Sequence, residues 1–249
     1  MNFIEEIEFC ENQISQLQSQ MGFGSAASVK DSGEIHALEY AFARLQDNCA
    51  VVDVGSHHGQ FLDVAYHPRM QFHCFEASPT AFKVLKRKYE DTANVKLNNC
   101  AIIPFSEGDC EMTLWSHSKG DGISSLVKRD ISHLKMDYDA EERVQTITLQ
   151  RYLEKNNHFE TGYLKLDTEG TEYEILYNHL AEGFFPKFIQ FEYGFCNVDS
   201  RTYLRDFYLL LRDEYDIFRI HPKGLYPCNQ YKESYENFHL INFLCELKK

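Results

Sequence analysis

Long apolar segments are absent from this chain of 249 residues. No run approaches 18 consecutive apolar residues, so we expect no membrane span. The N-terminus, MNFIEEIEFCENQ, lacks a basic region followed by an apolar core and is therefore not typical of a secretory signal. The length is sufficient for one large α/β domain or two small ones with a buried core.

Paired cysteine spacings are also lacking. The eight cysteines form no CxxC pair, and none stands at zinc-finger spacing from a histidine. Several lie in strand-like apolar runs, such as Cys74 in QFHCFEA and Cys245 in LINFLCEL. Because disulfide frameworks and structural zinc sites show characteristic spacings, this pattern favours reduced, buried cysteines in a cytoplasmic protein.

Basic residues are too few for nonspecific nucleic-acid binding. The chain has 25 Lys and Arg against 38 Asp and Glu, a formal net charge of −13 at pH 7. A protein that neutralises phosphates needs a basic surface. The one basic cluster, KVLKRKYE at residues 83–90, is typical of the solvated face of a helix. We therefore expect no nucleic-acid partner.

Internal repeats are absent, and the apolar pattern alternates between strands and helices. Helices are expected from residue 59, at 79–90, 171–180 and 200–214, and strands at 49–54, 71–77, 94–102, 110–116, 144–149, 163–167, 187–194, 215–221 and 238–247. This alternation predicts right-handed βαβ units, a mostly parallel sheet and helices on both of its faces. The last two strands lack a helix between them, which indicates an antiparallel hairpin at one edge.

The N-terminal segment has heptad spacing of apolar residues, at Phe3, Ile7, Cys10, Ile14, Leu17 and Met21. Fewer than three heptads are short for an independent coiled coil. The helix therefore either packs on its own domain or forms a homodimer contact. Asp31 and Glu34 have the spacing of a capping box and predict a second helix at 32–47. We take 1–47 as an N-terminal helical extension and 48–249 as the main domain.

Polar residues follow three predicted strands, where ligands bind in an open α/β sheet. The first group is Asp53-Val-Gly55-Ser56-His57-His58-Gly59. Glycine lets a strand turn sharply and leaves room for a ligand. The dinucleotide fingerprint G-x-G-x-x-G is absent, which disfavours a pyrophosphate cradle. Neighbouring histidines seldom chelate one metal, and no third ligand stands at zinc-like spacing, so the pair predicts no metal site.

Acidic residues end the other two strands. Glu76 follows Gly55 by about twenty residues, where a carboxylate can accept both hydroxyls of a ribose, as in NAD or S-adenosylmethionine sites. The third end is Lys165-Leu-Asp167-Thr-Glu169-Gly. A lysine in a buried strand needs a partner, and both Asp167 and Glu169 are candidates. A surface carboxylate and a structural ion pair are the alternative interpretations of these two ends.

The chain resembles the FkbM family of S-adenosylmethionine-dependent methyltransferases over about residues 50–194. The resemblance lies in DVGSHHGQF, FEASPTAF, NNCAI, SSL, VQTITLQRYL, YLKLDTEGTEYEIL and IQFEYG, in this order. It implies a Rossmann-like class I methyltransferase fold, with a mostly parallel seven-stranded sheet and an antiparallel edge strand. It also implies O-methylation of a hydroxyl of a sugar, glycan or other small molecule, with S-adenosyl-L-methionine as cofactor.

The resemblance further implies a cofactor site formed by Asp53, Gly55, Ser56, His57, Gly59, Glu76, Asn99 and Ala101. The glycine loop would surround the methionine part, Glu76 would bind the ribose, and Asn99 and Ala101 would approach the adenine. Relatives usually read D-V-G-A-N-x-G at the loop, so His57 stands where they carry Asn. They also carry Asp where this chain has Gln150.

Methyl transfer to a hydroxyl needs alignment of the reacting atoms and help from a base or a metal. The candidate catalytic residues are Asp167, Glu169 and His117, the last in the polar segment WSHSKGDGISSL. A divalent metal on Asp167, Glu169 and Glu192 is chemically possible but not favoured. We expect residues 116–143, with 194–200, to cover the acceptor.

Two other functions stay open at this point. A nicotinamide-dependent oxidoreductase would also use Glu76, but the missing fingerprint and LKLDTEGTE disfavour it. A cofactor-binding interaction module without catalysis is favoured only by Gln150.

Overall fold

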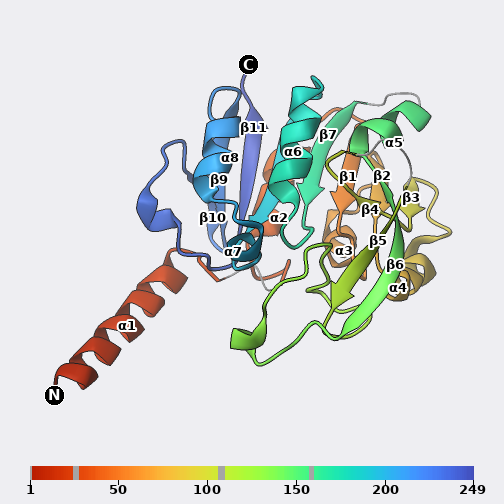
Figure 1. The fold of residues 1–249 in the computed structure, drawn as a ribbon. Coiled ribbons are helices and arrows are strands. Elements are labelled where there is room, and N and C mark those ends of the chain that lie inside the picture. Colours follow the sequence, from red (N-terminus) through yellow and green to blue (C-terminus); the bar gives the residue numbers. More distant parts are fainter. Residues whose placement is uncertain (1, 25–27, 106–109, 157–159) are drawn as a thin grey trace.

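A computed structural model describes residues 2–24, 28–105, 110–156 and 160–249. Its centre is an eight-stranded sheet in the order β10-β9-β11-β8-β7-β1-β2-β3 (Figure 1). The strands are β1 (Ala50–Val54), β2 (Gln71–Phe75), β3 (Val95–Asn98), β7 (Thr161–Leu166), β8 (Phe188–Tyr193), β9 (Tyr215–His221), β10 (Gly224–Pro227) and β11 (Ile241–Leu247). Strands β3, β2, β1, β7 and β8 are parallel, and β11 runs antiparallel to both β8 and β9.

Helices cover both faces of this sheet. They are α2 (Glu34–Phe42), α3 (Gln60–Ala65), α4 (Pro79–Tyr89), α5 (Leu149–Lys155), α6 (Glu172–Ala181), α7 (Cys196–Ser200) and α8 (Leu204–Leu211). One hydrophobic cluster packs α5, α6 and α8 against the sheet, and a second packs α2, α3 and α4. This three-layer arrangement confirms the predicted Rossmann-like α/β class.

The structure adds one strand to the predicted seven. After His221 the chain turns at Gly224 and pairs β10 with β9 as a short antiparallel hairpin. Strand β11 lies between β8 and β9. It therefore pairs antiparallel with β9, as the sequence predicts for the last two predicted strands, and also with β8. A four-residue strand such as β10 is too short to leave a periodic pattern in the sequence.

The predicted strand at 94–102 is divided between two sheets. Its first part is β3, and its second part is β4 (Ala101–Ile102) of a three-stranded sheet in the order β4-β6-β5. The other strands of this sheet are β5 (Cys110–Ser116) and β6 (Ala140–Ile147), joined by residues 117–139, which include the 3-10 turn η1 (Ser132–Leu134). Figure 1 shows β5 and β6 on the side of the molecule that carries α4.

Two of the predicted helices have different bounds in the structure. The helix predicted at 32–47 spans only Glu34–Phe42, and Gly33, at φ 94°, takes the N-cap position predicted for Asp31. A Cβ at Gly33 would lie 2.1 Å from the His221 carbonyl oxygen, so a tertiary contact overrides the local capping pattern. The helix predicted at 200–214 is divided into α7 and α8, with Arg201 at φ 56° between them.

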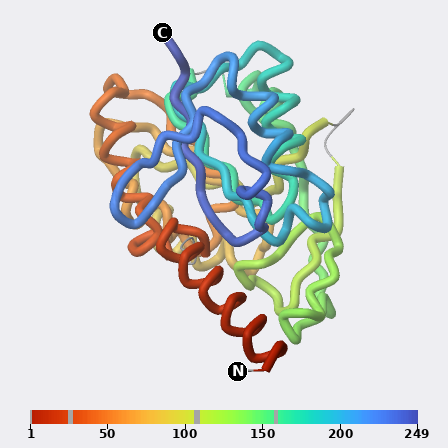
Figure 2. The backbone as a smooth tube through the Cα atoms, turned by 90° about the vertical axis from the view of Figure 1, so that its left-hand side faces the viewer, coloured from red at the N-terminus to blue at the C-terminus, as the bar shows by residue number. Residues whose placement is uncertain are grey.

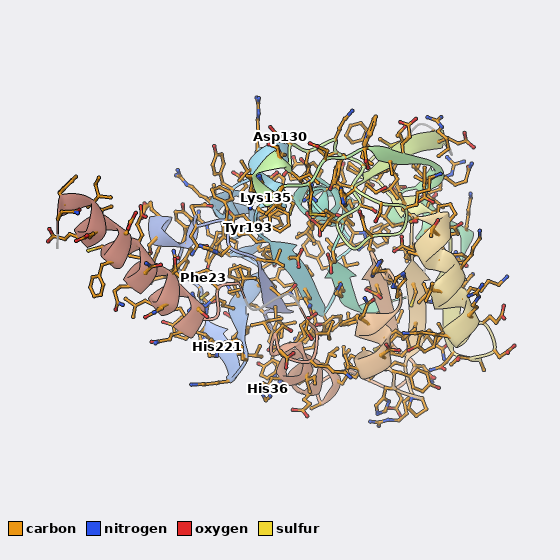
Figure 3. All side chains as sticks on the ribbon, turned by 90° about the horizontal axis from the view of Figure 1, so that it is seen from below. Phe23, His36, Asp130, Lys135, Tyr193 and His221 are labelled. Atoms are coloured by element: carbon orange, nitrogen blue, oxygen red, sulfur yellow. The ribbon has the colours of Figure 1, made fainter. Side chains whose placement is uncertain are left out.

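The first helix, α1 (Phe3–Gln20), projects away from the domain (Figure 2). None of its residues is buried, so the expectation that it packs on its own domain is wrong. The chain is anchored just after it: the His221 ring contacts the Gln20 carbonyl oxygen at 3.1 Å, and Phe23 is buried. Figure 3 shows Phe23 and His221 at the base of this helix. In the described residues, no helix is long and apolar enough to cross a membrane.

Candidate functional site

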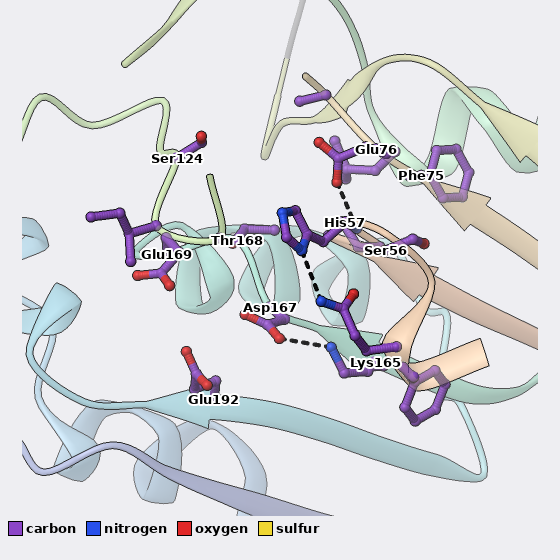
Figure 4. A pocket seen from close by; sticks show the side chains of 18 of the residues that line it. Ser56, His57, Phe75, Glu76, Ser124, Lys165, Asp167, Thr168, Glu169 and Glu192 are labelled. Atoms are coloured by element: carbon purple, nitrogen blue, oxygen red, sulfur yellow. Dashed lines mark hydrogen bonds and ion pairs between the residues drawn. The ribbon is translucent and has the colours of Figure 1, made fainter. Parts of the chain in front are cut away.

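A cavity of about 670 Å³ lies at the carboxyl ends of β1, β2, β7 and β8 (Figure 4). Its volume is within the range of small-molecule sites. The residues that line it include Gly55, Ser56, His57, Glu76, Ala101, Lys165, Asp167, Glu169 and Glu192. The topology therefore brings the three polar strand ends of the sequence into one site.

The turn after β1 packs directly against the end of β7. Gly55 has φ 87°, and a Cβ there would lie 1.7 Å from the Asp167 carbonyl oxygen. The Asp167 amide donates to the Val54 carbonyl at 3.0 Å, which fixes the two strand ends together. Gly59, with φ 83°, starts α3. The two glycines thus allow the tight β1–α3 turn that forms the cavity wall.

His57 connects this turn to two other walls. Its backbone amide donates to Glu76 at 2.7 Å. Its ring Nε2 donates to the Gly120 carbonyl at 3.0 Å, and its Nδ1 accepts from Gln60 at 3.1 Å, so a neutral ring with a proton on Nε2 satisfies both contacts. His58 stacks on the His57 ring with centroids 3.8 Å apart. The paired histidines therefore have contacts that account for them without a metal.

Glu76 is a buried carboxylate at the end of β2. Its two oxygens accept from the amides of His57 and Ser78, each at 2.7 Å. Burial raises the pKa of Glu76 to about 7, although both amides oppose that shift. The Asn99 side chain donates to the Glu76 carbonyl at 2.8 Å and so supports the chain beneath the site. Asn99 is not among the lining residues, whereas Ala101 is.

Asp53 lies below the cavity, fully buried. Burial raises the pKa of its carboxyl, and Lys165, 3.8 Å away, opposes this. Lys165 itself contacts Asp167 at 2.8 Å. Burial alone would lower the pKa of Lys165, but Asp167 and Asp53 raise it, so the lysine stays charged between two carboxylates.

Three carboxylates converge at the other end of the cavity. One oxygen from each of Asp167, Glu169 and Glu192 lies within 4.8 Å of the others. Figure 4 shows these side chains facing a shared space. Burial raises the pKa of Glu192 well above its ordinary value, and the neighbouring Asp167 and Glu169 raise it further. We call this cluster the acidic pole.

Of the two candidate partners of Lys165, Asp167 forms the ion pair and Glu169 does not. Glu169 pairs instead with Arg129, whose Nη1 lies 2.7 Å from its Oε2. Arg129 belongs to the irregular segment between β5 and β6 and also donates to the Ile123 carbonyl at 3.0 Å. No periodic pattern in the sequence predicts the position of Arg129. The sequence patterns indicate Glu192 only as one member of a possible metal set. They do not indicate that Ser28, Val29 and Lys30 line the cavity.

The irregular segment contributes to the cavity through residues 121–124 and Leu126, while Phe195 lines it from the end of β8. His117 lies in the same segment but is exposed and does not line the cavity; its Nδ1 contacts the Asp137 carbonyl at 3.0 Å. Gln150 lies in α5, where its side-chain amide donates a hydrogen bond to Glu154. The structure thus brings together two of the three predicted catalytic residues.

Comparison with known proteins identifies the domain. The family described as methyltransferase FkbM domain matches residues 53–218. Similar solved structures include a provisionally assigned rRNA methylase from Clostridium thermocellum (10% identity, 87% of this chain and 96% of that chain, TM-score 0.48). Another is a provisionally assigned methyltransferase from Streptococcus mutans in complex with SAH (11%, 85% and 96%, TM-score 0.45). A search of curated proteins found no match.

Proposed function

We propose, since this chain belongs to the FkbM family of S-adenosylmethionine-dependent methyltransferases, that it O-methylates a hydroxyl of a sugar, glycan or other small molecule. One observation carries this proposal. A single cavity joins Glu76, a carboxylate placed to accept ribose hydroxyls, to the acidic pole. The first supports cofactor binding, and the second supports recognition of a hydroxyl.

The cofactor end of the cavity suits S-adenosylmethionine. Each Glu76 oxygen accepts one amide, and a carboxylate oxygen has a second lone pair, which can accept a ribose hydroxyl. We assign the methionine part to the turn that contains Gly55, Ser56 and His57. Ala101 and Ile102 provide an apolar wall for the adenine. When bound, S-adenosylmethionine supplies a methyl group on a positively charged sulfur, which the acidic pole would favour electrostatically.

The acceptor end suits a neutral hydroxyl compound. A hydroxyl can donate a hydrogen bond to a carboxylate of the acidic pole. Ile123, Leu126 and Phe195 add apolar surface beside the pole. In the reaction a carbon–oxygen bond forms as the sulfur–methyl bond breaks. The hydroxyl loses its proton toward the acidic pole, and the products are a methyl ether and S-adenosylhomocysteine.

A labelled methyl-transfer assay tests this proposal. The purified full chain is incubated with methyl-labelled S-adenosylmethionine and the small-molecule fraction of a cell extract, and products are identified by mass. We expect label in a methyl ether that resists alkaline hydrolysis, and loss of labelling in Glu76→Ala. Label found only in hydrolysable esters, amines or nucleic acid would contradict the proposed acceptor.

We also propose that the protein forms a homodimer through α1 and that it is located in the cytoplasm. The exposed apolar stripe of α1, with Phe3 76% and Leu17 56% accessible, supports the dimer. None of the eight cysteines, all within the described residues, forms a disulfide, which supports a reducing compartment.

A further inference from the structure

We propose that Asp167, Glu169 and Glu192 bind one hard divalent cation, of the Mg²⁺, Mn²⁺ or Ca²⁺ class, at the acidic pole. The cation site itself follows from the geometry of these side chains. Only its role in methyl transfer rests on the proposed function.

Each of the three carboxylates keeps an oxygen available. Asp167 uses Oδ2 for Lys165, and Glu169 uses Oε2 for Arg129, while among the described residues the other oxygen of each group makes no hydrogen bond or ion pair. Within the described part of the chain, the Glu192 side chain makes no hydrogen bond or ion pair, although the residue is only 5% exposed. Ionisation of a buried carboxyl group without a partner is costly. A cation in this position would remove that cost.

A separate residue on the next strand points to a ligand. Asn242 on β11 pairs directly with Glu192 on β8, so both side chains lie on the same face of the sheet. Asn242 lines the cavity and is 5% exposed, and its Oδ1 has no hydrogen-bond partner among the described residues. An amide oxygen is a ligand that hard cations accept directly or through water. The position beside Glu192 therefore offers a fourth oxygen.

The separation of the oxygens fits an ion of this class. Ca²⁺ binds oxygens at about 2.3–2.6 Å, so two ligands on opposite sides lie about 5 Å apart, and Mg²⁺ needs a somewhat tighter arrangement. The three carboxylate oxygens lie within 4.8 Å of one another. A site made only of oxygen ligands does not favour the softer metals, which prefer thiolate ligands.

Two basic side chains, Lys165 and Arg129, hold two of the carboxylate ligands in position. Lys165, with a side chain 4% exposed, contacts one oxygen of Asp167, and Arg129, with a side chain 0% exposed, contacts one oxygen of Glu169. Such outer contacts orient ligands and are characteristic of built metal sites. For methyl transfer, a cation here would lower the pKa of an acceptor hydroxyl bound to it and so help the hydroxyl to lose its proton.

Calorimetric titration of the metal-free full chain with Mn²⁺ tests the site, with Glu192→Gln as the test variant. Asp213→Asn, whose carboxylate side chain is 82% exposed, is the matched control. We expect one saturable Mn²⁺ per wild-type chain, at least about tenfold weaker binding in Glu192→Gln, and unchanged binding in the control. Because Glu192 has no partner to lose, Glu192→Gln should melt at or above the wild-type temperature in metal-free buffer, and Mn²⁺ should raise only the wild-type melting temperature.

Absence of saturable Mn²⁺ binding to the wild type, or equal binding to Glu192→Gln, would overturn the cation site. S-adenosylmethionine binding is measured on the same samples. If the cofactor binds and Mn²⁺ does not, the cation proposal fails and the proposed function stands. If Mn²⁺ binds and the cofactor does not, the cation site stands and the proposed function fails.

Discussion

Glu76 is the side chain whose protonation should control cofactor binding. Its pKa is raised to about 7 by burial, so it is largely protonated below that pH in the ligand-free protein. A protonated carboxyl cannot accept from both ribose hydroxyls, and binding must then release the proton. Affinity for S-adenosylmethionine should therefore fall as the pH falls below about 7, by up to about tenfold per pH unit, and level off above it. Calorimetry between pH 5.5 and 8.5 measures this dependence.

The variant Glu76→Gln separates this effect from general changes in the fold. It should bind the cofactor more weakly at pH 8 and lose most of the pH dependence. The raised pKa also means that the folded state holds this proton more tightly than the unfolded state. Stability from this group is therefore fully present below pH 4.5 and lost as the pH rises toward about 7. A pH dependence of binding that persists in Glu76→Gln would assign it to another group.

The Arg129–Glu169 ion pair allows a prediction about stability. Arg129→Met leaves the Glu169 carboxylate buried without its cation, which should lower the free energy of unfolding by about 3–5 kcal/mol. The double variant Arg129→Met/Glu169→Gln removes both charges and should recover much of that loss. Urea denaturation of the two single variants and the double variant measures the coupling. Additive losses would mean that the pair does not interact as the structure indicates.

At the scale of elements, the β1–α3 turn depends on Gly55. Gly55→Ala forces a Cβ against the Asp167 carbonyl, which would separate the ends of β1 and β7. Gly183→Ala is a matched control, because Gly183 also has positive φ, 84°, but open space around its Cβ position. We expect the control to cost about 1 kcal/mol and Gly55→Ala several times more, with loss of cofactor binding. Equal melting temperatures would contradict the close approach.

The helix α1 makes a second prediction at this scale. If its stripe joins two chains, Ile14→Ser/Leu17→Ser should convert a dimer into a monomer, while Gln13→Ser/Gln16→Ser should not. Light scattering coupled to size exclusion gives the mass of each. A truncation should keep Phe23, because that residue is buried in the domain. A wild-type monomer at about 100 µM would exclude the dimer.

The local sequence pattern predicts the helices and strands whose positions depend on nearby residues, but not the features that depend on contacts between remote segments. Strands β1, β2, β7 and β8 are mostly apolar runs interrupted by single polar residues, and Ser78 with Pro79 begins α4 as the sequence indicates. Asp31 was wrongly assigned as a cap because the approach of His221 is a contact between remote segments. Arg129 was missed for the same reason: it lies in an irregular segment, and only the fold brings it to Glu169.

For the whole molecule, the family and the fold were accessible from motifs, whereas the electrostatics of the site were not. The sequence groups Asp167, Glu169 and Glu192 as a possible metal set, but only the topology adds Asn242, from a strand far along the chain. Three of the 38 acidic residues gather in the acidic pole, where Arg129 and Lys165 pair with two of them. That concentration distinguishes this cavity from an ordinary apolar pocket.

Cofactor binding is the most direct test of the account. Titration of the full chain with S-adenosylmethionine should give one site per chain, with binding lost in Glu76→Ala and retained in the exposed control Asp213→Asn. No saturable binding to the folded wild-type chain, or unchanged affinity in Glu76→Ala, would contradict the assignment of this cavity as a methyltransferase site.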